Sequence, residues 1–354
     1  MNHNQNQDTL AGWLEGQKDR LHVFPGGSDY WVRYRSIADW LAENVHADLN
    51  RAALCIDGEY LTDHGQKHIE KVIDRASKLA MTEQCQMTPY ETYLLLVAIQ
   101  LHDVGNIFGR LHHEEKIAEI VAQMGSLCGE DNVEKRWFMM IAQAHGGEIN
   151  GDRDKIGRLP RNEAILGLPV RIQFLAAILR FADELAEDRT RAARFSLNTG
   201  IVPKENEAYH KYAQYLHSVM VDPDNREIGM SFYVPVNDVR KKFGKGRGGD
   251  VYLLDEIFGR TVKTHVERMY CSRFLRPQIE IDTINVKIEI CAQKFSEVLE
   301  TIDYKLVERG YPENPPGGVH ALCPELNEWK TIGRLDGDSL HRCLGEAARE
   351  DRNG

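Results

Sequence analysis

The feature that most constrains the fold is an apolar run that follows Thr88-Pro89-Tyr90-Glu91. This tetrapeptide supplies an N-cap, a proline at the first helical position and a glutamate at the third, so it predicts where a helix begins. Residues 93–101 are then apolar on every side of that helix except at Gln100. A helix of this kind needs other elements around it. We therefore expect a buried central helix inside a larger helical domain.

Apolar residues at helical spacing predict further helices around the central one. These expected helices cover residues 8–20, 36–48, 64–79, 113–123, 133–145 and 169–192. No stretch before residue 215 has a convincing strand pattern. We therefore predict a mainly α fold for residues 1–215.

The pattern changes after about residue 215. Two β-rich runs, 217–222 and 227–234, flank Pro223-Asp224-Asn225-Arg226, a strong turn signal that predicts a hairpin. Residues 216–310 should thus form a smaller C-terminal α+β subdomain, and residues 311–354 an extended or loosely packed tail. The other elements expected in the subdomain are a helix at 250–275, a strand with Val286, Ile288 and Ile290 on one face, and a last amphipathic helix with Phe295, Val298, Leu299, Ile302 and Leu306.

Composition limits the class of protein. The 354 residues include 44 Lys and Arg against 54 Asp and Glu, a net charge of −10, which makes a duplex nucleic acid an unlikely partner because duplex binding needs a basic face. The sequence contains no stretch of about 18 apolar residues, so it predicts no membrane span. The first residues also lack the pattern of a signal peptide. We expect a cytoplasmic protein with no membrane partner.

Histidines and aspartates gather at the ends of the predicted helices. His102 and Asp103 end the apolar helix, His68 lies near the start of the helix before it, and Asp183 lies within a later apolar helix. Burying such groups without a partner costs several kcal/mol, so a metal is the economical partner. Because the seven cysteines form no Cys-x-x-Cys pair, the donors are nitrogen and oxygen, which suit a divalent Mn, Fe, Mg, Co, Ni or Zn ion.

These residues resemble the pattern of the HD superfamily of metal-dependent phosphohydrolases. That pattern is a helical histidine, an adjacent His-Asp pair at the end of an apolar helix, and a distant aspartate. The matching segments here are His68-Ile69-Glu70-Lys71-Val72, Leu101-His102-Asp103-Val104-Gly105-Asn106 and Leu179-Arg180-Phe181-Ala182-Asp183-Glu184-Leu185. The resemblance covers residues 60–195 and implies an HD-type helical bundle.

Some HD proteins, notably the cyclic-dinucleotide phosphodiesterases, bind a second metal through additional histidines. His113 and His145 fall where such ligands would lie, so the resemblance implies one or two metals per chain, with Asp103 bridging them. The Gly-Tyr-Pro motif of one group of diesterases is absent, since Gly146-Gly147-Glu148 follows His145. The metal ligands that the resemblance implies are His68, His102, Asp103, His113, His145 and Asp183.

Such a site polarises a phosphoryl oxygen and activates a bound water, and cations then stabilise the charge on the phosphoryl group. We expect Asp103, His113, Lys71 and Arg110 to take part in catalysis, and the candidates for binding the substrate phosphate are Lys67, Arg180, Arg189 and Arg191. His64 either orients a metal ligand or is a solvent-exposed residue of the turn 62–65, His112 is the alternative to His113, and Asp188 at most orients a ligand or pairs with an arginine. Between His112 and His113 we favour His113, because it begins an amphipathic helix.

A small nucleotide is the expected substrate, and three activities remain open. We prefer hydrolysis of a nucleoside or deoxynucleoside phosphate, as in the dNTP triphosphohydrolases. The alternatives are cleavage of a cyclic or linear phosphodiester, and nucleotide sensing without turnover, although the intact ligand set argues against a pure sensor.

The one basic, glycine-rich run is 241–249, which lacks the spacing of a P-loop. It is either a surface loop or the contact for an allosteric nucleotide. We also expect the chain to form a homo-oligomer.

Overall fold

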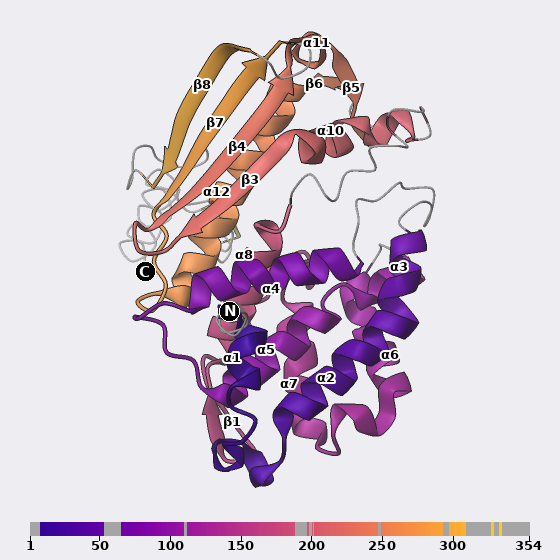
Figure 1. Ribbon diagram of the computed structural model, residues 1–354, viewed down its shortest axis with the longest axis vertical. Coiled ribbons are helices and arrows are strands. Elements are labelled where there is room, and N and C mark those ends of the chain that lie inside the picture. The colour runs from indigo at the N-terminus through magenta and orange to yellow at the C-terminus, as the bar shows by residue number, and fades with distance from the viewer. Residues whose placement is uncertain are drawn as a thin grey trace, which may run out of the picture. The chain divides into compact units, whose positions relative to one another are not determined.

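The computed structural model describes residues 8–52, 65–109, 112–187, 197, 200, 202–246, 249–292, 297–308, 327–328 and 333–334. Contacts divide the chain into two units, Met1–Val307 and Glu308–Gly354. The elements below all belong to the first unit, and Figure 1 shows how the helices and the strands follow one another along the chain.

Helix α5 (Pro89–Leu101) is the centre of the helical part, and every residue after Pro89 in it is buried. It begins with the predicted capping box, in which Thr88 and Glu91 each accept a hydrogen bond from the other's backbone. The mainly helical fold that this run predicted is therefore confirmed. The helices that contact α5 are α1 (Leu10–Glu15), α2 (Tyr30–Leu41), α4 (Gln66–Ala80), α7 (Asn132–Gln143) and α8 (Ile172–Glu184).

Shorter helices join these elements. They are η1 (Leu21–Val23), η2 (Pro25–Gly27), the π-helix η3 (Ala42–His46), α3 (Ala47–Ala52), η4 (Val104–Phe108), η5 (His113–Lys116), α6 (Ile117–Met124) and η6 (Gly125–Cys128). Taken singly, no helix in the described ranges is long and apolar enough to cross a membrane; the pair Pro89–Phe108 and His113–Cys128, bent by 117°, passes that test only when its two helices are combined.

A short hairpin corrects the expectation that no strand precedes residue 215. Strands β1 (Glu163–Ile165) and β2 (Leu168–Val170) pair antiparallel across Leu166 and Gly167, which have φ of 51° and 84°. Pro169, the expected first residue of a helix, lies in β2 instead, and α8 begins at Ile172. Two residues with positive φ make a tight hairpin turn, and this turn holds the proline in a strand.

The C-terminal part contains a mixed sheet in the order β3-β4-β7-β8 (Figure 1). Its strands are β3 (Leu216–Asp222), β4 (Glu227–Pro235), β7 (Thr283–Cys291) and β8 (Val298–Val307). The predicted hairpin and the predicted strand are confirmed as β3–β4 and β7. β4 and β7 are parallel, and the helix α12 (Leu253–Leu275) lies between them in sequence.

The last predicted helix is wrong, because residues 298–307 form the edge strand β8. β8 pairs antiparallel with β7. Its residues Ile302, Tyr304 and Leu306 alternate toward the core, so the strand period of two fits these residues as well as the helical spacing does. Because these residues pair with β7 through backbone hydrogen bonds, they form a strand and not a helix.

Within the basic run 241–249, Lys242–Gly244 form strand β5, which pairs antiparallel with β6 (Asp250–Tyr252), whereas Arg247 and Gly248 lie outside the described residues. Lys245 Nζ lies 2.7 Å from Oε2 of Glu256, whose side chain is fully buried in α12. This ion pair fixes Lys245 to the subdomain, whereas Lys241 and Lys242 are exposed. The remaining short elements here are η7 (Lys204–Asn206), α10 (Glu207–Tyr215) and α11 (Val236–Val239).

Candidate metal centre

Three elements that are distant in sequence bring one set of donors together. His68 lies in the first turn of α4, His102 caps the C-terminus of α5, and Asp183 lies in the last turn of α8. His68 Nε2 is 3.1 Å from Asp183 Oδ1 and 3.3 Å from His102 Nε2, and Asp103 Oδ2 is 3.4 Å from His68 Nε2 and 3.3 Å from His102 Nε2. These donors could hold a first cation.

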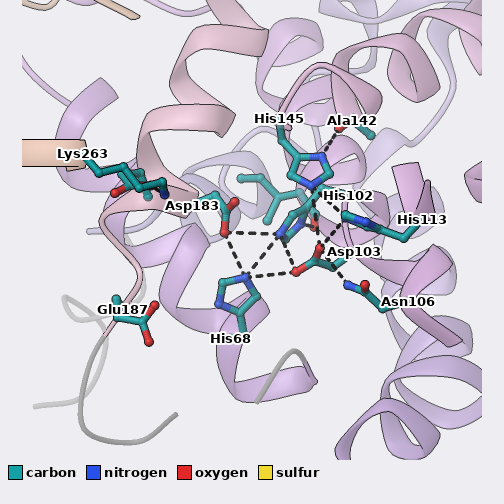
Figure 2. Close-up of polar contacts among 12 residues, drawn as sticks. His68, His102, Asp103, Asn106, His113, Ala142, His145, Asp183, Glu187 and Lys263 are labelled. Atoms are coloured by element: carbon teal, nitrogen blue, oxygen red, sulfur yellow. Dashed lines mark hydrogen bonds and ion pairs between the residues drawn. The ribbon is translucent and has the colours of Figure 1, made fainter. Parts of the chain in front are cut away.

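The other oxygen of Asp103 faces a second set of donors (Figure 2). His113, at the start of η5, places Nε2 3.3 Å from Asp103 Oδ1, and His145, just after α7, places Nε2 3.7 Å from the same oxygen. The two Nε2 atoms are 3.3 Å apart. Asp103 therefore lies between two groups of histidines and is shared by two potential cation positions.

The backbone explains how adjacent residues face one centre. His102 still has helical φ and ψ of −58° and −37°, whereas Asp103 leaves the helix at −108° and 1°. Asn106 Nδ2 then donates to Asp103 Oδ1 at 3.0 Å and fixes the carboxylate.

Gly105 makes the second set of donors geometrically attainable. A Cβ at this position would lie 1.8 Å from the backbone oxygen of His113, so any larger residue would push η4 and η5 apart. The glycine in the His-Asp segment thus allows His113 to approach Asp103.

Hydrogen bonds direct the imidazoles toward the two positions. Nδ1 of His102 is 2.8 Å from the carbonyl of Ile99, and Nδ1 of His145 is 2.6 Å from that of Ala142. A carbonyl can only accept, so Nδ1 carries a proton in both rings, and Nε2 is the nitrogen that can take a cation or a second proton. The Nε2 atoms lie 3.3 Å apart in the pairs His68–His102 and His113–His145, so each pair can share either a proton or a cation. The donor set therefore fits divalent cations with open coordination positions.

The pKa values of His145 and Asp183 shift in directions that suit metal donors. Burial and the charge of His102 lower the pKa of His145 to about 4, so its imidazole is a neutral donor near pH 7. Burial alone would raise the pKa of Asp183, but hydrogen bonds and charge from His102 and His68 hold it well below its usual value. Asp183 thus offers an ionised carboxylate oxygen to this cluster.

The other residues with predicted roles differ in where they lie. His112 has φ of 54° and an exposed ring 3.6 Å from Glu115, so of the two adjacent histidines it is His113 that reaches the cluster. Lys67 is exposed beside His68, and Lys71 is one turn after it. Arg180 forms two hydrogen bonds to Glu267 of α12. His64, Arg110, Asp188, Arg189 and Arg191 lie outside the described residues.

Four buried residues near this centre had not been predicted. Asn106 ends the segment that contains His102 and Asp103, and Glu114 directly follows His113, so their positions in the sequence could have identified them. Lys155 contacts Glu114, and this contact has no sequence signal. His46, in the π-helix, is fully buried, and its ring nitrogens form no hydrogen bond to the described part of the chain. Burial and the charge of His102 lower its pKa to about 4.

Comparison with known proteins gave one family. Searches of the curated proteins and of the solved structures found no significant match. The model of the HD-CE family matches residues 57–261, which is more than half of the chain and includes all six clustered His and Asp residues. The resemblance to HD proteins is thereby confirmed, and the chain belongs to the HD-CE family of HD-domain proteins.

Proposed function

We propose that this protein is a metal-dependent phosphohydrolase that uses two divalent cations. The observation that carries the proposal is the position of Asp103, whose two oxygens face two separate sets of histidines. His68, His102 and Asp183 would complete the first cation site, and His113 and His145 the second. A shared carboxylate is the arrangement expected when two cations act on one phosphoryl group.

The chain's own residues hold the donors in place for this chemistry. Bound cations of this kind supply Lewis acidity and lower the pKa of a bound water. Asn106 orients the shared carboxylate, and the backbone carbonyls of Ile99 and Ala142 orient two of the imidazoles. Such orientation before substrate binds is what makes electrostatic stabilisation effective.

The proposed substrate is a nucleotide, with a nucleoside or deoxynucleoside phosphate as the preferred class. Lys67 and Lys71, on the helix that carries His68, are the proposed contacts for its phosphates, since Arg180 already binds Glu267. The second set of histidines favours one further candidate, cleavage of a cyclic or linear phosphodiester, because the resemblance links such histidines to diesterases.

The test is release of phosphate, diphosphate or nucleoside from a panel of mononucleotides, dinucleotides and cyclic nucleotides with Mn, Mg, Co or Ni. The matched variants are Asp103→Asn and Asp224→Asn, the latter in the exposed turn between β3 and β4. We expect Asp103→Asn to lower turnover by at least about 1000-fold, since Lewis-acid stabilisation is worth several kcal/mol, and Asp224→Asn to have no effect.

The outcomes separate the alternatives. Turnover of diesters alone selects the second candidate, and binding of a nucleotide without turnover under any metal selects a sensor. Near-normal turnover in metal-loaded Asp103→Asn contradicts the proposed centre.

A further inference from the structure

His113 is oriented differently from the other histidine of its pair. The Nδ1 atom of His145 faces a backbone carbonyl. His113 follows a residue with positive φ and opens the short helix η5, and its Nδ1 lies 3.5 Å from a carboxylate oxygen, Oε2 of Glu114. A carboxylate at this nitrogen favours a proton there and leaves Nε2 for a cation.

Glu114 is buried, although its neighbour Glu115 is exposed. Its other oxygen, Oε1, lies 3.5 Å from Nζ of Lys155, which is also buried. Lys155 comes from the loop between α7 and β1, so this contact joins the loop to η5. The lysine offsets the cost of burying the carboxylate charge.

The space that Glu114 occupies depends on Gly147, two residues after His145. A Cβ at residue 147 would lie 1.7 Å from Glu114 Oε1 and 3.3 Å from Lys155 Nζ, and the residue has φ of 73°. Gly146 has nothing within 4 Å of the equivalent Cβ position. The glycine after the second histidine thus leaves room for the carboxylate that faces the first.

We propose that Glu114 is the positioning residue of the second cation site, and that Gly147 is required because it leaves room for the Glu114 carboxylate. Glu114 orients His113 without contacting the cation, and the loop that carries His145 also carries the glycine and the lysine. The contacts of Glu114 with Lys155 and Gly147 therefore join the segment of His113 to the loop that follows His145. The inference rests on the proposed function only in requiring that a cation binds between them.

The experiment measures binding of Mn²⁺ alone to the full chain, by titration and by the electron paramagnetic resonance of a spin-coupled manganese pair. Glu114→Gln keeps the side-chain shape, and Glu115→Gln is its matched control. We expect Glu114→Gln to raise the dissociation constant of the second Mn²⁺ by about 10–100-fold, to weaken the coupled signal and to leave the first Mn²⁺ unchanged. Glu115→Gln should match the wild type.

The glycine is tested separately. Gly147→Ala should weaken the second Mn²⁺ as Glu114→Gln does, while Gly146→Ala should not. Thermal unfolding with a chelator checks that each variant is folded. A Glu114→Gln protein that binds two Mn²⁺ with wild-type affinity overturns the positioning role and leaves the proposed function standing. A wild type that binds one Mn²⁺ overturns both.

Discussion

Arg180 in α8 binds the carboxylate of Glu267 in α12 through two hydrogen bonds, from Nε to Oε2 at 2.7 Å and from Nη2 to Oε1 at 2.9 Å. The guanidinium also lies over the ring of Tyr270, 4.5 Å from its centroid. Since Arg180 is one turn before Asp183, these contacts connect the helix of the last predicted metal ligand to the C-terminal subdomain. Two more ion pairs continue the connection along α12, Glu184 with Lys263 and Glu187 with Arg260.

Glu267→Gln should lower the free energy of unfolding by about 2–3 kcal/mol, because it leaves the mostly buried Arg180 without its charged partner. Replacing both residues by Met should recover most of that loss. The control is Asp39→Asn, which breaks the exposed Arg35–Asp39 pair and should cost at most about 0.5 kcal/mol. Denaturant unfolding with a chelator measures all four proteins, and equal losses in Glu267→Gln and Asp39→Asn would contradict the importance of the buried pair.

The metal content should depend on which histidine is changed. His145→Ala should reduce a fully loaded protein from two cations per chain toward one, because it removes a donor from the second position alone. His112→Ala, which removes an exposed imidazole beside His113, should keep both. Elemental analysis after dialysis against Mn²⁺ distinguishes them. If both variants retain the same number of cations, His145 is not a ligand.

Glu91 should make stability depend on pH. Burial would raise its pKa, but hydrogen bonds and charge from Arg171 hold the pKa below its ordinary value of 4.5. A lowered folded-state pKa stabilises the protein above the unfolded-state value, and that stabilisation is lost as the pH falls through the folded-state value. Glu91→Gln should cost about 3 kcal/mol at pH 7, and the difference from wild type should shrink below pH 4.5. Chelated samples unfolded across this range provide the measurement, and a difference that stays constant with pH would refute it.

Short sequence motifs correctly predicted those helix starts and turns that neighbouring residues determine. The capping box of Thr88 and Glu91 marks the start of α5, and the turn at 223–226 joins β3 to β4. Local spacing failed for β8, because antiparallel pairing with β7 outweighs a helical arrangement of a few apolar residues. It failed also for β2, where a tight turn places Pro169 in a strand.

The candidate site was predictable where its donors lie within recognisable segments, and the resemblance to HD proteins supplied their grouping. Contacts between distant segments were not predictable. The residues around Arg180 in the sequence give no sign that Glu267 binds it. The sequence likewise gives no sign that Lys155 and Gly147 lie next to Glu114. These partners become visible only when α12 and the loop after His145 are folded against the helical part.

The position of α12 also bears on how this protein can be divided for experiments. The family match ends at residue 261, inside a helix that runs from Leu253 to Leu275. A fragment cut at that boundary would keep Arg260 but lose Lys263, Thr264 and Glu267, and would expose the face of α8 that they cover. The smallest piece that keeps the surroundings of Asp183 intact must therefore extend beyond the homologous segment, through the end of α12.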